Sequence, residues 1–70
     1  MNKRKKFDLI RKKKNSMSLA ICSMTFCEKE SSCVAVNFNK QTNECELLSN
    51  VAMENQLIMD EGWMYLEARN

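Results

Sequence analysis

The sequence contains no histidine and no proline, has Gly62 as its single glycine, and is only 70 residues long. Without histidine it lacks the usual general base near neutral pH, the usual metal ligand and the middle member of a serine or cysteine triad. With so little proline and glycine it resembles neither a collagen-like chain nor a flexible linker. We therefore do not expect an enzyme, and no cofactor is implied.

Long hydrophobic runs are also missing. No apolar stretch reaches 18 residues, whereas a transmembrane helix needs about 20, so we expect no transmembrane segment. The run MSLAICSMTFC follows a basic start but contains hydroxyl side chains, and the segment CEKESSC after it offers no small-residue cleavage site. We therefore do not interpret it as a secretory leader.

Charge is distributed unevenly. Residues 1–14 contain eight basic residues and one acid, a net charge of +7, while the remainder contains three basic residues and eight acids, a net charge of −5. This asymmetry predicts a domain over residues 16–70, preceded at 1–15 by a basic segment that is either a disordered tail or a truncated first strand. The lysine-rich segment could bind nucleic acid or anionic surfaces, although few aromatic residues accompany it, which makes nucleic acid a less expected partner.

Apolar periodicity predicts one helix and three strands. Apolar residues recur at steps of three and four from Ser16, a candidate N-cap, to about Glu30, and we expect this helix to end soon after Cys27. Alternation predicts strands at residues 33–39 and 44–48, joined as a hairpin, and a last strand after Gly62. Residues 49–61 lack a clean period, and a helical turn is expected around residues 53–57.

The acidic residues do not form an obvious catalytic site. Glu44 and Glu46 share one face of a strand, which we expect to be exposed. Asp60 and Glu61 are adjacent, so they should point to different faces. No nucleophile with a partnered base is visible, and the C-x-x-C spacing typical of thiol redox enzymes does not occur.

Four cysteines, at positions 22, 27, 33 and 45, give the spacing C-x4-C-x5-C-x11-C. Zinc modules usually present closer cysteine pairs and often histidine, so a disulfide framework is favoured, with three pairings open. On an ideal α-helix Cys27 would lie about 140° from Cys22. We therefore expect the helix to be bulged or broken near residues 23–26, or to end early.

These cysteines belong to a longer pattern: two cysteines on a helix, then C-x-A-x-N-F-N, a polar turn, C-x-L and a closing G-W-x-Y strand. Over residues 17–67 this pattern resembles the PAN/Apple family, specifically the PAN core without the outer Apple cysteine pair. The matching residues are Cys22, Cys27, Cys33, Ala35, Asn37, Phe38, Asn39, Cys45, Leu47, Gly62, Trp63 and Tyr65.

The resemblance implies a small α+β domain in which one helix packs on a short antiparallel sheet, with disulfides Cys22–Cys45 and Cys27–Cys33. It further implies a non-catalytic extracellular or secreted module that binds a protein or carbohydrate ligand, as a monomer or as part of a larger chain whose N-terminal part is missing here. Trp63 and Tyr65 are candidates for stacking on a sugar, but an aromatic pair on one face of a terminal strand is expected to be buried.

Overall fold

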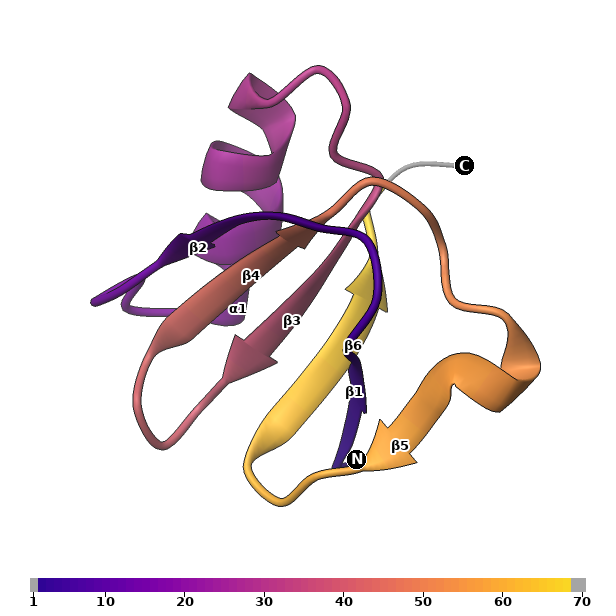
Figure 1. Ribbon diagram of the computed structural model, residues 1–70. Helices are drawn as coiled ribbons and strands as arrows, with labels where there is room; N and C mark the ends of the chain where they lie inside the picture. The colour runs from indigo at the N-terminus through magenta and orange to yellow at the C-terminus, as the bar shows by residue number, and fades with distance from the viewer. Residues whose placement is uncertain (1, 69–70) are drawn as a thin grey trace.

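The computed structural model describes residues 2–68 as three layers built on a four-stranded antiparallel sheet (Figure 1). A short helical segment covers one face of this sheet, and a two-stranded antiparallel sheet lies on the other. The α+β class expected from the sequence is confirmed. The elements are β1 (Lys3–Lys5), β2 (Leu9–Lys13), α1 (Leu19–Ile21), the π-helix η1 (Cys22–Cys27), β3 (Ala35–Asn39), β4 (Glu44–Leu48), the 3₁₀ turn η2 (Glu54–Gln56), β5 (Leu57–Met59) and β6 (Trp63–Glu67).

The helical segment begins at Ser18, two residues later than the expected cap at Ser16. The Ser18 hydroxyl oxygen accepts the N–H of Ile21 at 3.2 Å, which satisfies one of the free donors of the first turn. Ser16 is buried instead, and its N–H donates to the carbonyl of Asn43 at 2.9 Å. The residue between them, Met17, has a positive φ of 64°, so the chain turns sharply before the helix can start.

The irregularity expected in the helix is a π-helix over Cys22–Cys27. A π-helix bonds residue i to residue i+5, so residues five apart come close to the same face. Cys22 and Cys27 are separated by that interval, and both are fully buried against the sheet. The widened turn therefore resolves the 140° separation that an ideal α-helix would impose on the two cysteines.

The hairpin β3–β4 forms the centre of the four-stranded sheet, whose strand order is β2-β4-β3-β6. Its register pairs Ala35 with Leu48 and Phe38 with Cys45. The face of Phe38 and Cys45 packs under the helical segment as the hydrophobic core. All five residues of β3 are buried, because this strand is covered on both faces. The predicted hairpin and last strand are confirmed, within two residues at their ends.

Residues 3–13 form two strands, so the interpretation of this segment as a disordered tail does not hold. β2 pairs with β4, placing Leu9 opposite Leu48 and Lys13 opposite Cys45. β1 crosses the opposite face of the sheet and pairs with β5, placing Lys3 opposite Met59. The helical turn expected around residues 53–57 is η2, but β5, which follows it, was not expected. Strand formation by this lysine-rich segment depends on acidic partners elsewhere in the chain.

Candidate binding surface

The four cysteines lie in the core and form two disulfides. Cys22 is bonded to Cys45, with Cα atoms 5.6 Å apart, and Cys27 to Cys33, with Cα atoms 5.3 Å apart. All four side chains have an exposed fraction of 0%, and none is a free thiol. Over residues 2–68 no group of three or more histidine, cysteine or carboxylate side chains could hold a metal ion. The cysteines therefore stabilise the domain and form no reactive site.

Arg4 of β1 reaches across the sheet to two acidic residues. Its Nε donates to Glu46 Oε1 at 3.0 Å, its Nη2 also donates to Glu46, and its Nη1 donates to Asp60 Oδ2 at 3.1 Å. Burial opposes the charge on Arg4, but the hydrogen bonds to the two carboxylates outweigh it and raise the pKa of the guanidinium. The same group lies 3.7 Å from the centroid of the Trp63 ring, where it makes a cation–π contact.

Glu46 is buried, with 4% of its surface exposed, so the expectation that it lies on an exposed face is wrong. The alternation of Glu44 and Glu46 resembles a solvent-facing pattern, but β1 covers this face. Glu46 accepts hydrogen bonds from Arg4 and from the Asn37 side chain, the latter at 3.1 Å. A buried charge is tolerated when it is paired in this way.

The two aromatic residues of β6 differ in their surroundings. Trp63 is buried, as expected, beneath Arg4, so its ring is not available to stack on a sugar. Tyr65 is half-buried; its hydroxyl accepts the N–H of Ala52 at 2.6 Å and donates to Glu67 Oε2 at 3.3 Å. Burial is the main cause that raises the pKa of the Tyr65 hydroxyl. Tyr65 alone of the pair borders an open hollow.

The basic side chains of the lysine-rich segment do not form one continuous unpaired surface. Four of its eight cations form ion pairs: Arg4 as above, Lys5 with Asp8 at 2.8 Å, Arg11 with Glu30 at 3.3 Å and Lys12 with Glu44 at 3.2 Å. Lys13 lies over the Phe26 ring, 5.4 Å from its centroid. Much of the basic charge is thus used to attach β1 and β2 to the domain.

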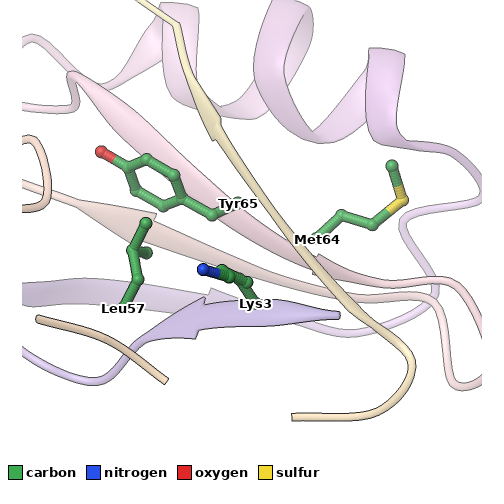
Figure 2. Close-up of a pocket in the computed structure, with 4 residues that line it drawn as sticks. All are labelled: Lys3, Leu57, Met64 and Tyr65. Carbon is green, nitrogen blue, oxygen red and sulfur yellow. The ribbon is translucent and has the colours of Figure 1, made fainter. Parts of the chain in front are cut away.

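A hollow of about 120 Å³ lies beside Tyr65 of β6, and Lys3, Leu57, Met64 and Tyr65 line it (Figure 2). Its lining is mostly apolar, and the Lys3 side chain points toward the space between Leu57 and Tyr65 (Figure 2). Small-molecule sites typically measure about 300–1,000 Å³. This hollow is smaller than that range and is of a size suited to one side chain.

A second, wider hollow of about 530 Å³ lies between η1 and the end of β6. It is lined by Ser23, Met24, Glu28, Leu66, Glu67 and Ala68. Met24 is 72% exposed and Leu66 39% exposed, so apolar surface is open to solvent here. This hollow lies on the helix side of the sheet, since Leu66 pairs with the core residue Val36.

Both hollows border the outer edge of β6. Consecutive residues of a strand point to opposite faces, yet Met64 and Tyr65 line the first hollow together, and Leu66 and Glu67 line the second. A hollow that is lined by residues from both faces must extend around an edge of the strand. The inner edge of β6 is occupied by β3, so each hollow extends around the outer edge. We call Lys3, Met24, Leu57 and residues 64–67 the β6 edge surface. The alternation in β6 predicted a strand, but no local signal could place that strand at an open edge.

No helix within residues 2–68 is long and apolar enough to cross a membrane. In the comparison with known proteins, a family model described as the PAN domain matches residues 3–70, nearly the whole chain. No curated protein and no solved structure matches the chain.

Proposed function

The chain belongs to the PAN domain family, and on this basis we propose that it is a non-catalytic module that binds another protein. The observation that carries this proposal is the β6 edge surface, where apolar side chains are exposed beside the outer edge of β6, with which no described strand pairs. Exposed apolar surface of this kind is typical of interaction sites. The non-catalytic part of the proposal is supported by the use of polar groups within the fold: the cysteines are bonded to each other, and Arg4, Glu46 and Asp60 are paired.

A protein ligand is favoured over a carbohydrate by two features of this surface. The hollow beside Tyr65 is small and apolar, whereas a sugar ring needs a flat aromatic face bordered by hydrogen-bonding groups. The larger aromatic residue, Trp63, is covered by Arg4. A carbohydrate ligand is the second candidate within the same class.

The test uses the immobilised domain with an extracellular protein mixture and, in parallel, a glycan array. We expect specific protein capture by the wild-type domain that is lost in Leu66→Asp. The matched control is Leu9→Asp, because Leu9 is also an exposed leucine, on the opposite edge of the sheet. Glycan binding without protein capture would favour the carbohydrate candidate. The absence of binding in both assays would contradict the proposed function.

We further propose that the domain works outside the cell or in the secretory pathway. Two disulfides in a domain of this size are typical of an oxidising compartment. Counting free thiols by mass spectrometry on natively produced protein tests this: no free thiol is expected, and four free thiols would contradict it.

The alternative is an intracellular protein whose lysine-rich N-terminus binds nucleic acid or anionic surfaces. The exposed lysines Lys6 and Lys14 favour it, while the ion pairs of Arg4, Lys5, Arg11 and Lys12 oppose it. Binding to nucleic acid through many phosphate contacts weakens steeply with salt. Tight binding with a steep salt slope would support this alternative, and binding that is absent or insensitive to salt would exclude it.

A further inference from the structure

We propose that the outer edge of β6 binds an extended segment of a partner protein as an added β-strand, with alternating apolar side chains and an acidic residue facing Lys3. This inference rests on the proposed function and specifies the mode of binding. Strand addition derives affinity from main-chain hydrogen bonds and specificity from pockets for alternate side chains.

The hydrogen-bonding groups of β6 are directed as this mode requires. On the inner edge, Ala68 N–H donates to the carbonyl of Val34 at 2.9 Å, and Lys40 N–H donates to that of Gly62 at 3.0 Å. In an antiparallel pair, residues that face the neighbouring strand alternate with residues that face away. Positions 64 and 66 therefore also face β3, and the main-chain groups of Tyr65 and Glu67 face outward, where no described strand pairs with β6.

The opposite edge of the sheet, formed by β2, is protected against pairing with another chain, whereas the outer edge of β6 is not. β2 contains Arg11, Lys12 and Lys13, and its register with β4 shifts between Leu9 and Arg11. Lysine side chains and bulges are the usual means of preventing an edge from pairing with another chain. The strand β6 has neither a lysine nor a register shift.

The two hollows beside β6 lie where consecutive side chains of an added strand would fall. Leu57 of β5 and Lys3 of β1 stand across the hollow from Tyr65 (Figure 2). A strand paired with β6 would place one side chain in that hollow and the next on the opposite face, against Leu66 and Met24. A second copy of this chain would bring its own β1 and β5 to the face where β5 already stands, so we commit to a segment of a different protein.

Charge defines the segment further. The Lys3 side chain is exposed, and within residues 2–68 no acidic side chain forms an ion pair with it. Its neighbours on β1, Arg4 and Lys5, are both paired. A carboxylate on the bound segment would form an ion pair with Lys3, and a lysine at the same position would be repelled by it.

The test is an NMR titration of the ¹⁵N-labelled domain with capped heptapeptides in which valine alternates with threonine and one threonine is replaced by glutamate. We expect the amides of Tyr65 and Glu67 to shift and to gain protection from exchange, with no change along β2. Replacing the glutamate of the peptide by lysine should weaken binding about tenfold, and Lys3→Glu should reverse this preference. Shifts confined to β2, or none at millimolar peptide, would overturn the proposal, as would self-association through β6 without peptide binding.

A pair of substitutions at Glu67 isolates the main-chain contact. Glu67→Pro removes an outward N–H that β3 does not use, and proline is tolerated at such edge positions; Glu67→Ala keeps the N–H. We expect peptide binding by Glu67→Pro to be about tenfold weaker than by Glu67→Ala, with the remaining amide spectrum of both variants unchanged. Equal binding by both variants would overturn strand addition. If captured proteins bind Glu67→Pro as well as wild type, strand addition is contradicted while the proposed function stands. If the peptides bind but the wild-type domain captures no protein, the proposed function is contradicted while the strand-binding edge of β6 stands.

Discussion

The side chain of Asn37 hydrogen bonds to both main-chain groups of Lys5, a residue 32 positions away in the sequence. Its Oδ1 accepts the Lys5 N–H at 2.9 Å, and its Nδ2 donates to the Lys5 carbonyl at 2.6 Å. A single buried amide thus takes the place of a neighbouring strand on the edge of β1 that faces away from β5. Because a buried peptide group without a partner is costly, this side chain fixes the position of β1 on the sheet.

Asn37→Ala should reduce the free energy of unfolding by about 3 kcal/mol, because it leaves buried groups of Lys5 without partners. Urea denaturation followed by circular dichroism measures this loss. Asn55→Ala, at an exposed asparagine, serves as the control and should change the free energy by less than about 0.5 kcal/mol. Equal losses in the two variants would contradict the role assigned to Asn37.

Arg4→Ala should cost about 3 kcal/mol of stability, because Glu46 would remain buried without its main charged partner. The loss should be accompanied by a change in Trp63 fluorescence as the indole becomes exposed. Arg11→Ala is the matched control: its ion pair with Glu30 is exposed and should contribute less than about 1 kcal/mol. A loss for Arg11→Ala as large as that for Arg4→Ala would show that burial is not the deciding factor.

Asp8 should make stability depend on pH in the acid range. Its hydrogen bond with Lys5 lowers the pKa of the carboxyl below the ordinary value of 3.8. A folded-state pKa below the unfolded value means that the stabilisation is complete above pH 3.8 and is lost as the pH falls through the folded pKa. Asp8→Asn keeps a residue that tolerates the positive φ of 66° at this position.

We expect wild type to be more stable than Asp8→Asn near neutral pH and this difference to shrink as the pH falls below 3.8 and through the folded-state pKa. Urea midpoints measured across this range test the expectation. Glu61→Gln, a substitution at another exposed acid, provides the control. A difference between wild type and Asp8→Asn that is constant with pH would show that the Asp8 charge is not responsible.

The two disulfides should differ in their contributions. Replacing Cys22 and Cys45 by alanine opens the longer loop and should cost about 3.4 kcal/mol, whereas replacing Cys27 and Cys33 should cost about 2.4 kcal/mol. Thermal unfolding of the two double variants gives the order, and peptide mapping without reduction checks the pairing in the wild-type protein. A larger loss for the Cys27 and Cys33 variant would show that packing, not loop length, decides.

The central part of the fold could be predicted from local patterns. Alternation located β3 and β4, and the run of aromatic and apolar residues after Gly62 located β6. The unusual interval between Cys22 and Cys27 indicated the helical irregularity. Strands β1 and β5 could not be found in this way. Lysine has low strand propensity, and β1 is held by its pairing with β5 and by contacts with Asn37, Glu46 and Asp60, all far along the sequence.

The candidate site was less predictable for a related reason. The residues of β6 were identified as a strand, but whether a strand lies at the centre or the edge of a sheet depends on the pairing of the whole chain. Glu46 shows the same limit: its alternation with Glu44 suggested a solvent-facing side, and only the position of Arg4 makes it an interior residue.

The attachment of β1 also constrains the order in which the domain is made. This strand leaves the ribosome before every group that holds it, including its pairing partner β5 and the Asp60 that follows. Contacts between distant parts of a chain form slowly because a long loop must close first. The pairing of β1 with β5 and the contact between Arg4 and Asp60 therefore cannot form until synthesis has passed Asp60, and complete docking of β1 becomes a late step in biogenesis.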